Sequence, residues 1–355
     1  MNTTANLLQL LGCRLPVIQA PMAGVQGSRL ALAACRAGAL GSLPAAMLTP
    51  EKLCAELDAL QAGTDQPYNV NFFAHRQPAP DAAQQARWLQ ALMPFYREFG
   101  LSEHDIATGG GRQPFSREQA DIVAAYRIPV VSFHFGLPEP QLLEQVKAAG
   151  SVVMSSATTV AEARWLEEHG ADIIIAQGLE AGGHRGIFNQ SFDSCIKTAD
   201  LVQLLKQHCS APVVAAGGIM TGQQAKAMLQ LGADAVQLGT AFVQCKTSNA
   251  NDAYRKALFN QPLTQVTASI SGRPARGLIN HWHTQVDIPD RPPVPEYPYA
   301  YDLGKQLHAA ASQQGDHGFG AFWAGSNVAQ IRELEAADLI NQLVLEMNMA
   351  EHQLH

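Results

Sequence analysis

The chain has 355 residues, of which 47% are hydrophobic and 15% are charged, and its formal net charge is −7. An acidic chain without a run of Lys and Arg has no field that attracts nucleic acid or an anionic membrane. No apolar stretch has the length of a membrane span and the first eleven residues do not resemble a signal peptide, so we expect a cytoplasmic protein.

Eight short apolar segments recur along the chain, and a helical pattern follows each of them. The segments are apolar throughout instead of alternating, which is typical of parallel strands that are covered on both faces. Eight alternating β and α units predict an α/β fold in which residues 1–355 form one (β/α)8 TIM barrel, with a doubly wound open sheet as the competing fold. The segments are 15–21, 40–45, 68–73, 130–136, 151–157, 172–178, 212–218 and 235–241.

Two connections are too long for plain βα loops. Residues 74–127 follow the third strand and contain a helical pattern over 81–99 and the turn Gly109-Gly110-Gly111. Residues 246–301 follow the eighth strand and include a proline-rich part. Both leave the carboxyl ends of strands, where the active sites of barrels lie. We predict a helical lid over 74–127 and a pocket-lining extension over 246–301, with peripheral decoration as the alternative.

The last helical pattern, over 328–348, is amphipathic. We expect it to close the bottom of the barrel or to pack against another subunit. The six cysteines lie far apart without a CxxC or a Cys/His cluster, so the sequence suggests neither a metal site nor a disulfide framework.

Glycines end the last two strands and predict a phosphate site. Gly217 and Gly218 end the seventh strand, and Gly239 ends the eighth, before the hydroxyl of Thr240. The loops after these two strands of a barrel often hold a phosphate, which glycine lets backbone N–H groups approach. A helix N-terminus after each loop adds its dipole. Ordinary tight turns are the alternative reading, and no P-loop or Rossmann fingerprint is present.

The sixth strand runs into a glycine-rich loop that begins at Gln177. Gln177 both donates and accepts hydrogen bonds, as the edge of a flavin pyrimidine ring requires. Gly182 and Gly183 would let the backbone press against a planar ring, and His184 titrates near neutrality and can take or give a proton. Glu180 is expected to hold the loop. The alternative for His184 is a solvated or structurally bonded histidine.

Three further segments carry candidate residues. Met22 ends the first strand and is placed to lie against a flavin, with an ordinary turn as the alternative. Asn71, or Asn69 on the same face of the third strand, can reach a ring carbonyl, and a buried structural amide is the alternative. In the tail, Tyr297, Tyr301 and Lys305 share one face if the segment is helical, and would anchor a small carboxylate.

These segments resemble the class I nitronate monooxygenases, in order along most of the chain. The loop EAGGH and the glycines of strands seven and eight are specific for a superfamily of FMN barrels, which also contains quinone and enoyl reductases. The SGRPARG segment and the Tyr-Lys tail favour class I. The matching segments are PVIQAPMAG (16–24), VNFF (70–73), VVSFHFGLP (130–138), AQGLEAGGHRG (176–186), AAGGI (215–219), QLGTAF (237–242) and SGRPARGLIN (271–280).

The resemblance implies oxidation of alkyl nitronates such as propionate 3-nitronate by O2, without a nicotinamide, by a monomer or homodimer. His184 would be the active-site histidine, and Tyr297, Tyr301 and Lys305 would line the substrate pocket. The alternatives are an NAD(P)H-dependent quinone or enoyl reductase, a flavin-binding protein without turnover and a sugar-phosphate isomerase. FMN would be held by Met22, Asn71, Gln177, Gly182, Gly183, Gly217, Gly218, Gln237, Gly239 and Thr240.

Overall fold

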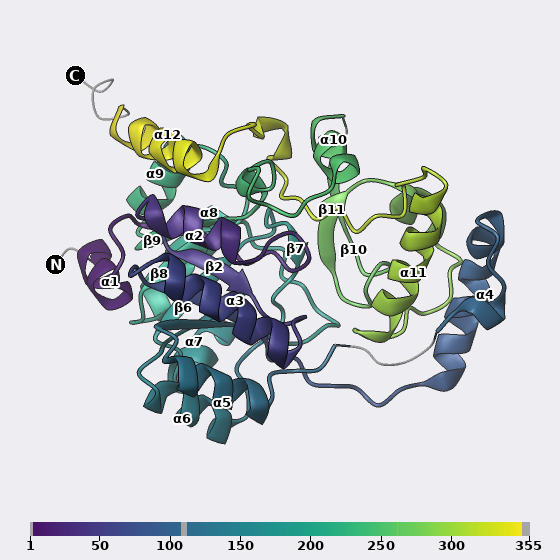
Figure 1. Cartoon of the computed structure of the whole chain (residues 1–355), viewed down its shortest axis with the longest axis horizontal. Helices are drawn as coiled ribbons and strands as arrows, with labels where there is room; N and C mark the ends of the chain where they lie inside the picture. The colour runs from purple at the N-terminus through teal and green to yellow at the C-terminus, as the bar shows by residue number, and fades with distance from the viewer. Residues whose placement is uncertain (1–2, 108–111, 261, 350–355) are drawn as a thin grey trace.

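The computed structural model describes residues 3–107, 112–260 and 262–349, and its centre is a barrel of eight parallel strands (Figure 1). The strand order is β1-β9-β8-β6-β5-β4-β3-β2, and a parallel bridge between Ile18 and Leu40 joins the two ends. The predicted (β/α)8 fold is confirmed. The strands are β1 (Val17–Gln19), β2 (Gly41–Pro44), β3 (Tyr68–Phe73), β4 (Val130–His134), β5 (Val152–Ala157), β6 (Ile173–Gln177), β8 (Val213–Ala216) and β9 (Ala235–Leu238).

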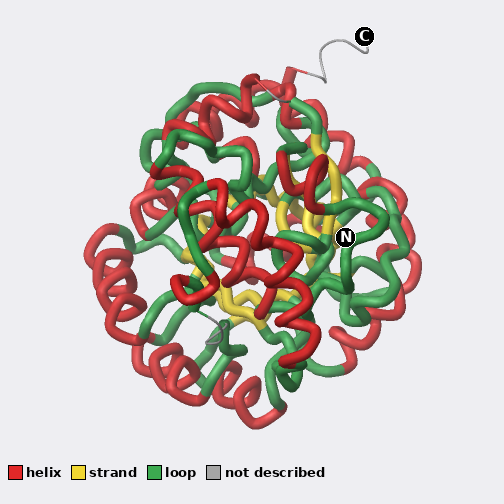
Figure 2. Tube along the Cα trace, turned by 90° about the vertical axis from the view of Figure 1, so that its right-hand side faces the viewer, coloured by secondary structure: helices red, strands yellow, loops and turns green. Residues whose placement is uncertain are grey.

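Helices surround the strands, as Figure 2 shows from the end that carries α4 (Ala82–Glu98) and α11 (Tyr299–Gln313). Gly170 and Gly232 follow α7 and α9 with φ of 102° and 108°, the left-handed conformation expected of glycine after a helix end. None of the described helices is long and apolar enough to cross a membrane. The helices of the ring are α2 (Ser28–Arg36), α3 (Pro50–Gly63), α5 (Arg117–Tyr126), α6 (Pro140–Ala148), α7 (Val160–Glu168), α8 (Thr198–His208) and α9 (Gly222–Gln230).

The bottom of the barrel is closed by α1 (Thr3–Leu11), at the start of the chain. Its Leu7 and Leu11 are buried in one apolar cluster with Ile18, Val130 and other side chains of the barrel strands. The opposite faces of the strands pack against the helices in a separate, larger cluster. The expectation that the last helix closes the bottom is therefore wrong.

The last helix, α12 (Ala336–Met349), instead takes the place of the eighth helix of the ring, in contact with α9 and α2 (Figure 1). The N–H of Gly222 donates to Oε2 of Glu346 at 2.6 Å. A Cβ at Gly222 would lie 2.1 Å from the carbonyl oxygen of Leu343, so only glycine allows this approach. Between β9 and α12 the chain therefore forms the extension at the carboxyl end of the barrel, and only then adds the eighth helix of the ring.

We expect Leu343→Ala to lower the free energy of unfolding by about 2–5 kcal/mol, because Leu343 is fully buried where α12 docks and its loss leaves a cavity. Leu345 is 55% exposed on the same helix, and Leu345→Ala should cost less than about 0.5 kcal/mol. Urea unfolding followed by circular dichroism measures both variants. Equal losses would contradict the docking of α12.

The insertion after β3 and the extension after β9 meet in a second apolar core at the carboxyl end of the barrel. The helix α4 (Ala82–Glu98) packs against α11 (Tyr299–Gln313), and we call this pair of helices the cap (Figure 1). Trp88 and Trp282 are fully buried in its core, and the hydroxyl of Tyr96 donates to the carbonyl oxygen of Leu303 at 2.6 Å. Segments far apart in sequence thus form one structure.

The boundaries of these two segments differ from those expected. The helix α5 packs against α3 and α6 and belongs to the barrel ring, so the inserted part ends before residue 117 instead of at 127. The turn Gly109-Gly110-Gly111 lies outside the described residues. The extension continues beyond 301, because α11 and the chain after it pack onto the same core. It also includes α10 (Asp252–Asn260), the π-helix η3 (Trp282–Val286) and the 3-10 helix η4 (Val328–Gln330).

A small antiparallel sheet connects the extension to the loop after β6. It consists of β10 (Thr264–Thr267), β11 (Ala275–Leu278) and β7 (Gly183–His184). Ala275 pairs with His184, and the N–H of Arg185 donates to the carbonyl oxygen of Pro274 at 2.8 Å. The sheet therefore fixes the backbone that carries His184.

Candidate active site

A cavity lies at the carboxyl ends of the barrel strands, between the barrel and the cap. Most of the residues singled out from the sequence line it, although they come from five strand ends and from α11. Tyr297 and Lys305 are not among its lining residues. The predicted residues that line the cavity are Met22, Asn71, Gln177, Gly182, Gly183, His184, Gly217, Gly218, Gln237, Gly239, Thr240 and Tyr301.

The glycines after β8 have the backbone that a tight anion loop needs. Gly217 and Gly218 have φ of 128° and 70°, which other residues rarely adopt. After β8, α9 begins at Gly222 behind the capping residue Thr221. After β9 there is only one turn of 3-10 helix, η2 (Thr240–Phe242), so the expected second helix N-terminus is absent from this loop.

Gly182 is needed for a reason other than the one expected. A Cβ at Gly182 would lie 2.7 Å from the carbonyl carbon of Ala324 and the nitrogen of Gly325, so the glycine is required for the close approach of the chain that follows the cap. The same segment closes onto β9, where the N–H of Gly325 donates to Oγ1 of Thr240 at 2.9 Å. Nothing lies within 4 Å of a Cβ placed on Gly183, whose φ is 77°.

Two amides present polar atoms suited to a flavin. The Oε1 atom of Gln237 is buried without a hydrogen-bond partner, which an N–H of a bound ring system would supply. Asn71 lines the cavity and donates to Oγ of Ser132 at 2.9 Å, whereas Asn69 is fully buried and donates to Oγ of Ser42 at 3.0 Å. Asn71 is therefore the amide within reach of a ligand. These residues fit an aromatic cofactor with hydrogen-bonding edges.

His184 projects into the cavity among aromatic side chains. Its ring centroid lies 5.4 Å from that of Tyr297, 5.7 Å from Tyr301 and 5.3 Å from Trp323. Its Nε2 lies 2.9 Å from Oγ of Ser271, and this hydroxyl donates its proton to the carbonyl oxygen of Arg273 at 3.1 Å. Ser271 must then accept from Nε2–H, which leaves Nδ1 of His184 as the proton acceptor.

His184 is neutral near pH 7. Burial lowers its pKa well below 6.5, and the positive charges of Arg112 and Arg273 lower it further. His134 supports the same loop, because Nε2 of His134 donates to the carbonyl oxygen of His184 at 3.1 Å and Nδ1 lies 2.6 Å from Oγ of Ser156. Burial lowers the pKa of His134 to about 4. Both imidazoles therefore contact the cavity without a charge.

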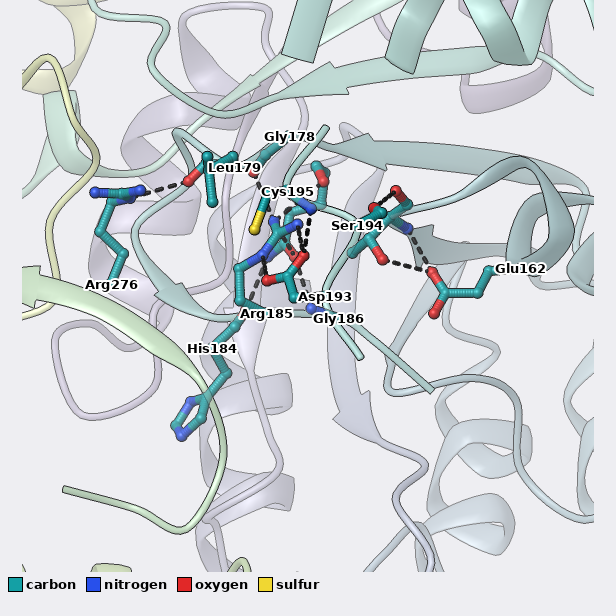
Figure 3. Close-up of polar contacts among 12 residues, drawn as sticks. Glu162, Gly178, Leu179, His184, Arg185, Gly186, Asp193, Ser194, Cys195 and Arg276 are labelled. Atoms are coloured by element: carbon teal, nitrogen blue, oxygen red, sulfur yellow. Dashed lines mark hydrogen bonds and ion pairs between the residues drawn. The ribbon is translucent and has the colours of Figure 1, made fainter. Parts of the chain in front are cut away.

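A buried ion pair fixes the loop between Gln177 and Cys195 (Figure 3). Nε and Nη2 of Arg185 contact the two carboxylate oxygens of Asp193 at 2.7 and 3.0 Å. Nη1 of Arg185 donates to the carbonyl oxygen of Gly178 at 2.7 Å. Gln177 belongs to the same network, since its carbonyl oxygen accepts from Nη1 of Arg185 at 3.2 Å, and its Nε2 donates to the carbonyl oxygen of His184 at 2.9 Å. The ion pair and these hydrogen bonds therefore hold the backbone of the loop that carries His184.

Glu180 accepts from the N–H and hydroxyl of Thr198 at 2.8 and 2.9 Å, in line with the structural role expected for it. Gln177 likewise uses its amide within the protein, because its Oε1 accepts from the N–H of Gly186 at 2.7 Å. One N–H of Gln177 is left for a ligand.

The tail residues lie around the cavity in a different way from that expected. The helix α11 begins at Tyr299, so Tyr297 precedes it and the three residues do not share a helical face. Tyr297 is buried behind His184, and Lys305 is exposed with Nζ 5.3 Å from the ring centroid of Tyr301. Only Tyr301 reaches the cavity from this set.

Several lining residues escaped the sequence analysis. They include Arg112, His134, Tyr254 and Trp323. Arg112 and Trp323 lie in irregular segments without a periodic pattern. His134 was visible in the segment VVSFHFG at the end of a predicted strand, which is the signal that was not used.

Comparison with known proteins gives one consistent family. The model of the nitronate monooxygenase family matches residues 4–346. The nitronate monooxygenase of Pseudomonas aeruginosa is 44% identical over 97% of this chain and 99% of that protein. The nitronate monooxygenase of Paraburkholderia phytofirmans is 42% identical over 98% of this chain and 96% of that protein.

Two solved structures resemble the chain over almost its whole length. The nitroalkane oxidase from Streptomyces ansochromogenes has a TM-score of 0.89 and 35% sequence identity, and the match covers 98% of this chain and 99% of that one. FabK from Thermotoga maritima has a TM-score of 0.75 and 25% identity, over 98% and 97% of the two chains.

Proposed function

This chain belongs to the nitronate monooxygenase family, and on that premise we propose that it oxidises alkyl nitronates with O2 and FMN. The proposed substrate is propionate 3-nitronate, the products are the semialdehyde, nitrite and nitrate, and the role is detoxification. The observation that supports an anionic substrate is the charge of the cavity. Its described lining includes the guanidinium of Arg112 and contains no Asp or Glu.

FMN is proposed because the cavity combines a phosphate-type loop with the unpaired amide oxygen of Gln237 and with the amides of Asn71 and Gln177. Gly217, Gly218 and Thr240 would hold the phosphate, and Gln237, Asn71 and Gln177 would contact the edges of the ring, with Met22 and the remaining glycines, Gly182, Gly183 and Gly239, beside it. Bound FMN would supply the electron acceptor and the reaction with O2.

His184 then has different roles for the two protonation states of a substrate. A nitronate is already deprotonated, so His184 only positions it. A neutral nitroalkane must first lose a proton from carbon, and Nδ1 of His184 would accept that proton. An imidazole with so low a pKa is a weak base, which favours the nitronate as the better substrate. The aromatic side chains of Tyr297 and Tyr301 exclude water, and Lys305 would attract anions to the entrance.

The rival function is an NAD(P)H-dependent quinone or enoyl reductase, which the likeness of folds leaves open. The test is oxygen consumption by the purified yellow protein with propionate 3-nitronate, beside anaerobic mixing with NADH and NADPH. We expect rapid oxygen uptake and no bleaching of the flavin by either nicotinamide. Bleaching by NAD(P)H without nitronate-dependent uptake would overturn the proposal and establish a reductase.

A further inference from the structure

Arg112 is a buried cation without a counter-ion in the described structure. Its side chain is 9% exposed and lines the cavity. Nε and Nη1 have no hydrogen-bond partner, and Nη2 donates to the thioether sulfur of Met47 at 3.4 Å. Unpaired donors on a buried charge are unfavourable, so this arrangement indicates a position that an anion fills.

The surroundings hold the guanidinium in place without neutralising it. Its central carbon lies 4.0 Å from the ring centroid of Tyr301 and 5.9 Å from that of Tyr297. The backbone of Arg112 is fixed as well, because its carbonyl oxygen lies 3.1 Å from Nε2 of His75. An aromatic face attracts a guanidinium, but it does not take up the N–H groups, which can still donate to another acceptor. The donors are therefore positioned before any ligand binds.

Neither of the other cations near the cavity fits this role as well. Lys305 also lies over Tyr301, but it is exposed and does not line the cavity. Arg273 is buried, but its Nη2 donates to the carbonyl oxygen of Ile187 at 2.7 Å and it packs on the ring of Phe135. It too lies outside the lining. Among the described residues that line the cavity, Arg112 is the one with a permanent positive charge.

Tyr301 connects this cation to the reaction centre. It contacts Arg112 with its ring and lies 5.7 Å, centroid to centroid, from His184. A small substrate with its reacting carbon beside His184 therefore has its far end near Arg112. A carboxylate at that end matches the guanidinium, which can bind it through two parallel N–H donors.

We propose that Arg112 binds the carboxylate of nitronates that carry one, and so gives the enzyme its preference for substrates with a second negative charge. The proposal rests on the nitronate oxidation proposed above, and it replaces Lys305 with Arg112 as the carboxylate-binding residue.

The experiment compares Arg112→Met with the wild-type holoenzyme on two substrates. Propionate 3-nitronate has the carboxylate, and propyl-1-nitronate has a methyl group in its place. Loss of a charged hydrogen bond should lower kcat/KM for the first about 10- to 100-fold, mainly through KM. The value for the second should change less than about threefold. Methionine keeps an unbranched apolar stem and removes the guanidinium, and retained flavin absorbance shows that the fold is intact.

Two variants are matched controls. Arg87→Met removes an exposed arginine of α4 and should leave both kcat/KM values unchanged. Lys305→Met removes the other cation over Tyr301 and should lower the value for propionate 3-nitronate less than Arg112→Met does. A larger loss in Lys305→Met than in Arg112→Met would overturn the assignment. Equal losses on the two nitronates in Arg112→Met would also overturn it.

A binding measurement separates this inference from the proposed function. Succinate carries a carboxylate where propionate 3-nitronate carries the nitronate, so it should bind without reacting. Calorimetric titration of the holoenzymes should show binding to the wild type and at least tenfold weaker binding to Arg112→Met. If the wild type oxidises neither nitronate, the proposed function fails, and the succinate titration still decides on Arg112. Unchanged succinate affinity in Arg112→Met would refute the inference.

Discussion

Replacement of His184 by asparagine should lower the oxidation of a neutral nitroalkane about 10²- to 10⁴-fold, the usual contribution of a positioned base. The oxidation of the corresponding nitronate should fall less than about tenfold, because that substrate needs no proton transfer from carbon. The reason lies in Nδ1 of His184, which is the free proton acceptor once Nε2–H is bound by Ser271. Initial rates with a nitroalkane and with its preformed nitronate measure the two effects.

The pH dependence gives an independent check on His184. Burial first, and then the charge of Arg112, hold its pKa well below 6.5, so the neutral base persists as the pH falls through 6.5. Nitroalkane oxidation by the wild type should therefore show no loss with the ordinary histidine pKa of about 6.5. A wild-type profile that falls at that pH would contradict the neutral assignment.

Ser271→Ala tests whether the proton on Nε2 of His184 matters for the reaction. It removes the acceptor of Nε2–H and leaves the His184 ring in place, so either nitrogen can then carry the proton. We expect a smaller loss than in His184→Asn, confined to the nitroalkane. Equal losses on nitroalkane and nitronate, in either variant, would show that His184 acts only by shaping the cavity.

The barrel was predictable from the sequence because each of its strands can be recognised from its own short stretch of residues. Each strand is a continuous apolar run, and glycines such as Gly170 and Gly232 mark the helix ends. The positions of His184, Gly217 and Gln237 followed, because the carboxyl ends of barrel strands meet at one face. The family model and the whole-length match to a solved structure confirm the resemblance read from these motifs.

The cap and the last helix were not predictable in the same way, because contacts between distant segments form them. The packing of α4 on α11 places Tyr96 beside Leu303. A local sequence pattern does not indicate a contact between residues that lie so far apart in the chain. Arg112 lies in an irregular segment. Such a segment has no helical or strand periodicity and no helix cap, so the sequence does not predict where its side chains point. One signal was available and misread. Tyr297 precedes a proline, and the residue before proline is disfavoured in a helix.

The second large effect is expected from Asp193→Ala, which should lower the free energy of unfolding by about 3–5 kcal/mol. Arg185 is 0% exposed, and the variant would leave its charge buried without the carboxylate that contacts Nε and Nη2. The loss should be concentrated in the loop that carries His184, because Arg185 also bonds to the carbonyl oxygen of Gly178. Urea unfolding and the rate of limited proteolysis measure the two consequences.

Lys246→Ala provides the control for an ion pair at the surface. Lys246 is 86% exposed in its side chain and lies 3.4 Å from Glu335, so its removal should cost less than about 1 kcal/mol. A loss for Asp193→Ala as small as that for Lys246→Ala would mean that the loop is held by its backbone contacts with β11 and not by the ion pair.

The pH dependence of Asp193→Ala follows from the sign of its pKa shift. Burial alone would raise the pKa of Asp193, but the hydrogen bonds from Arg185 and from the N–H of Cys195, together with the charge of Arg185, outweigh it and lower the pKa. A carboxylate with a lowered pKa stabilises the fold above its ordinary pKa of about 3.9 and loses that contribution as the pH falls through the lowered value. The difference between wild type and Asp193→Ala should therefore stay constant from about pH 5 to 8 and narrow only in acid. A difference that changes near neutrality would assign the effect to the histidines of the cavity instead.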